Sequence, residues 1–182
     1  IINKKVHFLN KSFDILTEFK SKNDLISYNL NYFDYLNNFD KKNKFFFLRS
    51  IIIWIKCSKN KHKLDPYPTS LRIVNWIYFI KHYNVNLKTN NLILLTLYNH
   101  SNILYKNIEY NLLGNHLFKN AKALIFAGLF FKSKISDRWL KKGLKIFKKQ
   151  VSEQILKDGG HYELSPMYHS IFLLDLIEIY LL

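Results

Sequence analysis

The sequence predicts an all-α fold, and three observations point to it. The chain of 182 residues contains only 5 Gly and 3 Pro, so few positions favour tight turns. Its long apolar stretches carry hydrophobic residues three and four positions apart, as in helices that bury one face. Hydrophobic residues make up 48% of the chain, which is ample for a packed core. We therefore expect mostly helical structure with little room for short strands.

The N-terminal part of the sequence predicts an arm and a first long helix. Residues 8–35 mix apolar and polar side chains, end in an aromatic cluster, and are predicted to form an arm or a helix. Residues 45–56 are strongly apolar and predict a helix. The lysine-rich residues 58–63 predict a loop.

The next helix is predicted to follow a proline-containing turn. Residues 65–70 read DPYPTS, and two prolines disfavour a regular helix over that stretch. Thr69 and Ser70 are suitable N-cap residues. We therefore expect the helix to begin there and to continue through SLRIVNWIYFIKHY.

Four more helices are predicted downstream. They span residues 89–105, 116–131 and 139–156, and the last begins at Ser165 or Pro166. In the second of these helices, small residues such as Gly128 lie on the apolar face and permit close contact with a neighbouring helix. Helices joined by short polar loops form antiparallel hairpins, from which either a solenoid or a closed (α/α) toroid is built.

Charge and hydropathy narrow the classes of function. The sequence has no run of about 18 uncharged apolar residues, so it predicts no membrane span. The formal charge of +15 would suit a polyanionic partner. Lysine supplies nearly all of the excess in a chain that is also rich in Asn and Ile, the bias of an AT-rich genome, so we expect no nucleic-acid partner. Cys57 stands alone, without a disulfide partner or a metal-ligand spacing.

Both ends of the sequence are expected to be truncated. The chain starts at Ile1 rather than Met, its first residues carry several charges, and no signal peptide is visible. At the other end, the apolar helical pattern continues to Leu182 without a C-cap glycine. The expected helical domain therefore spans residues 1–182 of a longer polypeptide.

Two segments have more polar side chains than helix packing explains. They read EYNLLGNHLFKNAKAL at residues 109–124 and DGGHYELSPMYH at residues 158–169. Both lie at predicted helix starts, where side chains project into loops or clefts. We therefore expect the functional residues in these two segments.

These two segments, with DPYPTSLRIVNW at 65–76 and LNYFDYL at 30–36, resemble the N-terminal helical domain of the heparinase II/III family of polysaccharide lyases. The four motifs occur in the family's order and cover most of the chain. The resemblance implies part of an incomplete (α/α) toroid, with the family's C-terminal β-sandwich domain absent from this chain. It also implies cleavage of a uronate-containing acidic polysaccharide by β-elimination, without metal or cofactor, in the periplasm or cell envelope.

β-Elimination needs three groups: one to neutralise the C6 carboxylate, one to remove the C5 proton, and one to protonate the leaving oxygen. The resemblance implies that Asn115 neutralises the carboxylate with help from His116. It implies that Tyr168 is the acid and, in some members, also the base. Acid duty suits a tyrosine, whose ordinary pKa is about 10. In other members a later histidine is the base, and His161 and His169 are local candidates.

Further residues are predicted to line the substrate cleft. Arg72 can bind a carboxylate through two hydrogen bonds, and Trp76 can stack on a sugar, with Asn75 as a neighbouring polar group. Structural roles fit these three residues equally well. The weaker candidates are Tyr67, His161, Tyr162, Glu163 and His169. Glu163 is also the kind of acidic residue that stabilises a helix N-terminus.

Structural interpretations remain open for the catalytic candidates as well. Asn115 is a suitable helix N-cap, His116 could be a buried histidine with satisfied nitrogens, and Tyr168 could be a core aromatic whose hydroxyl bonds to the backbone. The sequence also departs from the family pattern at Leu64, where the family often has Trp. That departure puts one sugar-stacking surface in doubt.

Two other functions compete with a lyase. One is a non-catalytic carbohydrate-binding or assembly module of an envelope polysaccharide locus. The other is a basic helical protein that binds nucleic acid, which would bind DNA with a steep dependence on salt.

Overall fold

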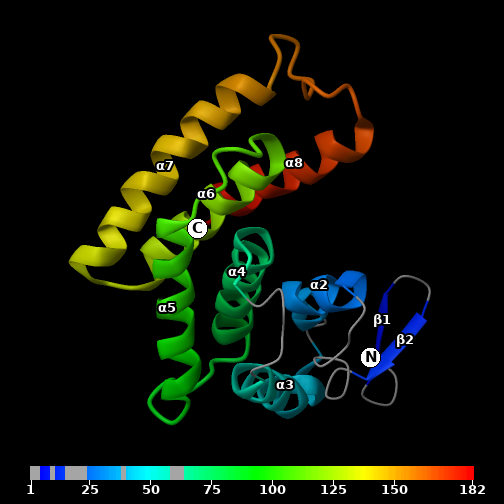
Figure 1. Ribbon diagram of the computed structural model, residues 1–182, viewed down its shortest axis with the longest axis vertical. Helices are drawn as coiled ribbons and strands as arrows, with labels where there is room; N and C mark the ends of the chain where they lie inside the picture. Colours follow the sequence, from blue (N-terminus) through cyan, green and yellow to red (C-terminus); the bar gives the residue numbers. More distant parts are fainter. Residues whose placement is uncertain (1–4, 9–10, 15–23, 38–39, 58–63) are drawn as a thin grey trace. The chain divides into compact units, whose positions relative to one another are not determined.

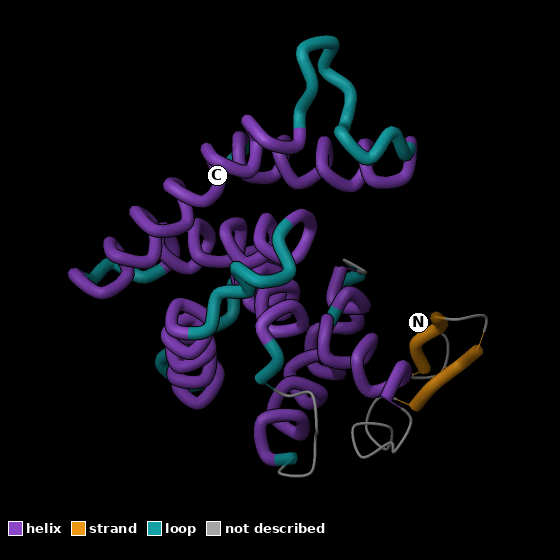
Figure 2. Tube along the Cα trace, turned by 45° about the horizontal axis from the view of Figure 1, so that its top comes forward, coloured by secondary structure: helices purple, strands orange, loops and turns teal. Residues whose placement is uncertain are grey.

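A computed structural model describes residues 5–8, 11–14, 24–37, 40–57 and 64–182. In this part of the chain the all-α prediction is confirmed, with seven α-helices, two 3₁₀ turns and one short β-hairpin (Figures 1 and 2). The chain divides into two compact units, residues 1–100 and residues 101–182. Each unit is described by itself.

The first unit begins with an antiparallel hairpin that the sequence did not predict. Strand β1 pairs with β2 in a register that places Val6 opposite Phe13. Strands of four residues are too short to produce a distinct alternating pattern. The elements of this unit are β1 (Lys5–Phe8), β2 (Lys11–Asp14), α2 (Asp24–Tyr32), η1 (Asp34–Asn37), η2 (Lys41–Asn43), α3 (Lys44–Lys56), α4 (Pro66–His82) and the first part of α5 (Asn91–Lys106).

Helix α4 begins earlier than predicted. Its first residue is Pro66, with Asp65 in the N-cap position, so the predicted start at Thr69 or Ser70 is wrong. Proline is compatible with the first turn of a helix because the N–H groups there need no intrahelical acceptor. The N–H of Thr69 already donates to Asp65 O at 3.0 Å, which closes the first turn. The predicted loop at 58–63 lies outside the described residues.

The second unit holds the three helices that follow α5. They are α6 (Gly114–Phe130), α7 (Lys134–Gln154) and α8 (Pro166–Tyr180), close to the predicted positions. Helix α7 begins before the predicted boundary because Ser133 caps it, accepting a hydrogen bond from the N–H of Ser136 at 3.2 Å. Every described helix is too short or too polar to span a bilayer.

Helices α6 and α7 pack antiparallel at very short range. A Cβ atom at Gly128 would lie 2.6 Å from Leu140 Cβ, and one at Gly143 would lie 2.9 Å from Ala121 O. Gly128 of α6 faces Leu140 of α7, whereas Ala121, earlier in α6, faces Gly143, later in α7. The two helices therefore run antiparallel. The prediction that Gly128 permits close helix contact is confirmed.

Replacing Gly143 by Ala is expected to destabilise the α6–α7 pair. The new Cβ would meet both Ala121 O and Ile125 Cγ1 at 2.9 Å, so the helices must move apart. Overpacking of this kind costs about 1–3 kcal/mol, and the better helix propensity of Ala offsets about 1 kcal/mol of it. Urea unfolding should therefore show a net loss of about 1–2 kcal/mol. Exposed Lys145 on the same helix is the control, since K145A should change stability by less than about 0.5 kcal/mol.

Candidate active site at the helix starts of the second unit

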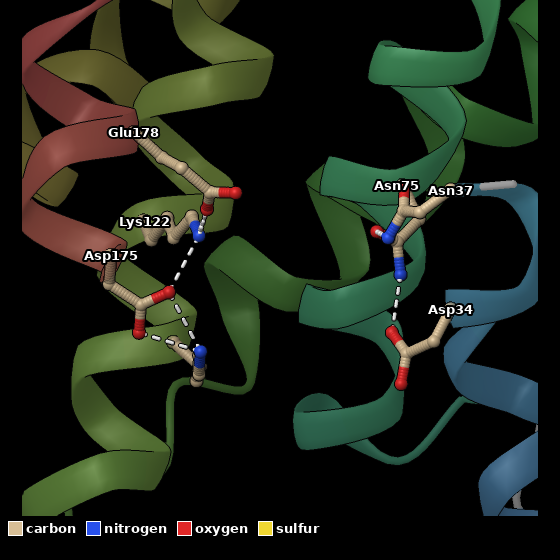
Figure 3. A network of polar contacts seen from close by, with 7 residues as sticks. Asp34, Asn37, Asn75, Lys122, Asp175 and Glu178 are labelled. Carbon is tan, nitrogen blue, oxygen red and sulfur yellow. Dashed lines mark hydrogen bonds and ion pairs between the residues drawn. The ribbon is translucent and has the colours of Figure 1, made fainter. Parts of the chain in front are cut away.

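A buried ionic network joins α6 to α8. Lys122 Nζ lies 2.6 Å from Asp175 Oδ1 and also contacts Glu178, while Lys119 Nζ lies 2.6 Å from Asp175 Oδ2 (Figure 3). Asp175 is 1% exposed and Lys122 is 5% exposed. Charges buried this deeply need partners, and breaking such a pair is costly. The network therefore fixes how α8 lies against α6.

Helices α6 and α8 run parallel, so their N-terminal ends lie at the same end of the unit. The rings of Phe118 and Phe172 are 4.2 Å apart between centroids, and the ionic contacts follow further along both helices. Asn115 lies about one turn before Phe118, and Tyr168 lies about one turn before Phe172. Parallel packing thus places both predicted catalytic residues at one end of the unit.

Tyr162 connects the two segments that the sequence singled out. Gly114 begins α6 with a φ of +47°, and a Cβ atom there would lie 3.3 Å from the Tyr162 hydroxyl. The Tyr162 ring lies 4.9 Å from the ring of His161, which in turn stacks on Tyr168 at 6.3 Å and 24°. Residues from 109–124 and 158–169 therefore meet through a continuous series of contacts.

Asn115 lies inside the first turn of α6 rather than at its N-cap. The cap position belongs to Leu113, and no side chain caps this helix, so the N-cap interpretation of Asn115 is wrong. Asn115 Oδ1 is buried and has no hydrogen-bond partner among the described residues. The amide of Asn115 is therefore not committed to holding the helix start together.

His116 is half-exposed, which removes the interpretation of a buried histidine. Its side chain is 40% exposed, and its Nδ1 atom lies 3.2 Å from Glu109 Oε1. The ring of His116, the residue next to Asn115, is therefore accessible to solvent.

Tyr168 lies in the first turn of α8 and is half-buried. Ser165 caps this helix, and its Oγ accepts a hydrogen bond from the N–H of Tyr168 at 3.5 Å. Within the described residues, no hydrogen bond engages the Tyr168 hydroxyl. Packing therefore accounts for the ring of Tyr168 and leaves its hydroxyl without a structural role in the unit.

His161 and Tyr162 have different environments although they are adjacent. His161 is 2% exposed; its Nε2 lies 3.1 Å from Gln154 Oε1, and its Nδ1 accepts the N–H of Glu163 at 3.3 Å. Both ring nitrogens are engaged, which favours a structural role. Burial, followed by the nearby Glu163 carboxylate, raises the pKa of Tyr162, so this hydroxyl stays protonated at neutral pH. Glu163 itself is exposed.

His169 faces an apolar cavity of about 210 Å³. The other residues that line this cavity come from α7, α8 and the loop between them, namely Val151, Ile155, Gly159, Phe172, Leu173 and Leu176. Apolar walls of this kind suit helix packing better than binding of a sugar. The role of His169 as a base or binding residue stays a prediction.

Arg72 is deeply buried in the first unit. It is 0% exposed, and its guanidinium donates to Asn31 O at 3.1 Å and to Thr69 Oγ1 at 2.9 Å. Its guanidinium carbon lies 4.2 Å from the centroid of the Trp54 ring. Burial lowers the pKa of Arg72 to about 9. These contacts favour the structural interpretation of Arg72.

The other cleft candidates of the first unit also make internal contacts. Trp76 is 0% exposed and packs edge-to-face on Phe33 and Trp54. Asn75 donates to Tyr32 O at 2.8 Å. It also donates to Asp34 Oδ1 at 2.8 Å (Figure 3). The half-buried Tyr67 ring packs on that of Tyr32 at 5.8 Å. Substrate binding by Tyr67, Asn75 and Trp76 stays a prediction.

Replacing Arg72 by Ala is expected to destabilise the first unit by about 3 kcal/mol or more. The change removes the two hydrogen bonds and the ring contact of a fully buried side chain and leaves a cavity. Thermal or urea unfolding measures the effect. R138A, at an exposed arginine on α7, is the control. If R72A unfolds like R138A yet weakens polysaccharide binding, Arg72 is a ligand residue instead.

Glu109 and Asn120 are polar residues of this region that sequence reasoning missed. Glu109 Oε2 accepts a hydrogen bond from Asn120 Nδ2 at 3.0 Å, and its Oε1 reaches His116. A spacing of four residues places His116 and Asn120 on one face of a helix, which was the available signal. Among the described residues, no group of three or more His, Cys, Asp and Glu side chains could hold a metal ion.

Comparisons with known proteins identify the family to which the chain is similar. Residues 68–182 match the family model described as heparinase II/III N-terminus. A heparin-sulfate lyase from Bacteroides stercoris is 41% identical over 61 residues, which are 33% of this chain and 9% of that protein. A heparin-sulfate lyase from Pedobacter heparinus is 36% identical over 66 residues, which are 36% of this chain and 10% of that protein.

A third relative, a heparin-sulfate lyase from Bacteroides thetaiotaomicron, is 38% identical over 66 residues, again 36% of this chain and 9% of that protein. The matches thus span about a tenth of the length of these curated relatives. No solved structure matches the chain.

Proposed function

We propose a function for this chain, which belongs to the heparinase II/III family because residues 68–182 match the N-terminal domain of that family. In this proposal the complete polypeptide cleaves a uronate-containing acidic polysaccharide by β-elimination. One observation carries the proposal. Asn115 and Tyr168 lie in the first turns of two parallel helices. Among the described residues, Asn115 Oδ1 has no hydrogen-bond partner and no hydrogen bond engages the Tyr168 hydroxyl. Polar groups without a structural role at adjacent helix starts are suited to binding a ligand.

In this proposal Asn115 acts on the carboxylate of the uronate. Its Nδ2–H donates a hydrogen bond that strengthens as negative charge develops on the carboxylate during removal of the C5 proton. The positive end of the α6 dipole adds to this stabilisation because Asn115 lies in the first turn. His116, the next residue, supports the same carboxylate.

Tyr168 acts on the leaving group. As the C5–H bond breaks, its electron pair forms the C4=C5 double bond, and the C4–O bond breaks toward the glycosidic oxygen. The Tyr168 O–H gives its proton to that oxygen, and the resulting phenolate recovers a proton before the next cycle. The products are a new chain end and an unsaturated uronate.

Two kinds of group can remove the C5 proton. Tyr168 serves as base if it is deprotonated at the start, and a histidine elsewhere in the complete polypeptide serves otherwise. His161 is a weaker candidate because both of its ring nitrogens are engaged within the unit. Tyr162, whose raised pKa keeps its proton in place, is suited to donating a hydrogen bond to the sugar.

The proposed substrate class is supported by the curated relatives, which are heparin-sulfate lyases. The net charge of +15 is compatible with an acidic polymer. Heparan-type glycosaminoglycan, alginate-like uronan and acidic capsular polysaccharide all carry the carboxylate that the mechanism requires.

The test is ultraviolet absorbance of the complete polypeptide mixed with each of these three polymers. A lyase produces a rising absorbance from the unsaturated uronate with at least one of them, and none with a neutral glucan. Tight binding to a polymer without any rise in absorbance supports the alternative, a non-catalytic carbohydrate-binding module.

A further inference from the structure

Glu109 is held in place by Asn120 from two sides. The backbone N–H of Glu109 donates to Asn120 Oδ1 at 2.9 Å, while Asn120 Nδ2 donates to Glu109 Oε2 at 3.0 Å. Asn120 is 0% exposed and the Glu109 side chain is 12% exposed. These two bonds fix the carboxylate of Glu109 in one orientation just before α6 begins.

The second carboxylate oxygen of Glu109 is directed at His116. Oε1 lies 3.2 Å from His116 Nδ1. A carboxylate can only accept a hydrogen bond, so Nδ1 must carry the proton in this contact. His116 is therefore held as the Nδ1–H tautomer, in which Nε2 is the atom that can take up a proton.

We infer that Glu109 is a positioning residue that sets the tautomer and orientation of His116, so that Nε2 of His116 acts on the substrate carboxylate beside Asn115. The inference rests on the proposed function. A proton taken up from solvent on Nε2 lies between the imidazole and the uronate carboxylate, and the Glu109 carboxylate balances the charge on the ring.

A purely structural role would not need a carboxylate at position 109. Tying the loop to Asn120 requires one acceptor atom on the side chain, which a neutral amide provides without the cost of desolvating a charge. The charged group is explained by its other oxygen, which reaches a half-exposed histidine next to Asn115. The same carboxylate thus supports the loop and orients a residue of the candidate site.

The decisive variant is E109Q, which keeps the shape and reverses the hydrogen bond. The Gln oxygen can still accept from Asn120 Nδ2, but its NH₂ group donates to His116 Nδ1, which then must be unprotonated. Nitrogen NMR of the histidine side chains reads the tautomer directly in this chain. Wild type is expected to show His116 as Nδ1–H, and E109Q is expected to show Nε2–H.

The control is D137N, which also removes one negative charge, at an exposed position in the first turn of α7. It is expected to leave His116 as Nδ1–H. A wild-type chain with His116 as Nε2–H, or a folded E109Q chain with an unchanged tautomer, overturns the inference. The wild-type measurement decides by itself if E109Q does not fold.

Kinetics of the complete polypeptide separate this inference from the proposed function. E109Q is expected to lower kcat about 100-fold with KM within about 3-fold of wild type. The amide NH₂ that replaces the carboxylate donates to His116 Nδ1, so it opposes the doubly protonated ring that pairs with the uronate carboxylate. A lyase whose E109Q variant keeps full kcat contradicts the inference alone. A wild-type polypeptide without lyase activity contradicts the proposed function, and the NMR result then still decides how Glu109 holds His116.

Discussion

Replacing Tyr168 by Phe is expected to lower kcat for formation of unsaturated uronate by about 10²–10⁴-fold, the usual contribution of a general acid. The variant removes only the hydroxyl. The ring keeps its stacking on His161, and the hydroxyl makes no hydrogen bond within the described residues, so the fold should be unaffected. Initial rates followed by ultraviolet absorbance give the effect, and thermal unfolding shows that stability is unchanged.

Tyr162→Phe is the matched control for this prediction. Tyr162 lies in the same region, with its hydroxyl against Gly114, and is proposed only to donate a hydrogen bond to the sugar. Its loss should raise KM or lower kcat by no more than about 10-fold, the effect of one neutral hydrogen bond. If Y168F retains wild-type kcat, Tyr168 is not the acid.

Replacing Asn115 by Ala is expected to lower kcat by about 10²–10³-fold, as when a donor to a developing negative charge is removed. The effect should appear in kcat more than in KM, because the hydrogen bond strengthens in the transition state. N115D should be at least as inactive as N115A, since a second carboxylate repels that of the uronate. Stability should change little, because the Asn115 side chain does not cap α6.

Asn111→Ala provides the control for Asn115. Asn111 lies exposed in the loop just before α6 and is expected to leave kcat unchanged. Equal losses in N111A and N115A would mean that the loop as a whole, rather than the amide of Asn115, is responsible. Wild-type kcat in N115A would exclude Asn115 as the group that neutralises the carboxylate.

Most helices of the fold could be predicted because their apolar residues recur with helical spacing. The start of α4 and the β1–β2 hairpin were not predicted correctly, because only a few neighbouring residues determine each of them. Two prolines in DPYPTS suggested a turn, yet both fit the first turn of α4, where N–H groups need no partner. The hairpin of β1 and β2 is too short to leave a pattern.

The candidate site could be predicted in composition but not in geometry. The segments 109–124 and 158–169 are conspicuous because their polar residues interrupt apolar helices. Their approach depends on the parallel packing of α6 and α8, which the pairing of Lys122 with Asp175 fixes over a long sequence separation. No local pattern encodes such a pairing.

Helix α4 shows the opposite limit. Its polar residues suggested a cleft, but Arg72 and Asn75 are buried along with the apolar residues around them. A stripe of apolar residues does not reveal that the remaining faces of a helix are covered as well. The hydrogen bonds of Arg72 to Asn31 and of Asn75 to Asp34 join residues 41 positions apart in the sequence, so the sequence pattern of α4 does not predict them.

The complete polypeptide is proposed to cleave its polysaccharide by β-elimination, with the active site at the N-terminal ends of α6 and α8. The most direct measurement is mass spectrometry of the products formed in water labelled with ¹⁸O. Elimination predicts products that carry an unsaturated uronate and no ¹⁸O at the cleaved bond. Incorporation of ¹⁸O at the cleaved bond, without unsaturated product, would show hydrolysis and contradict the account.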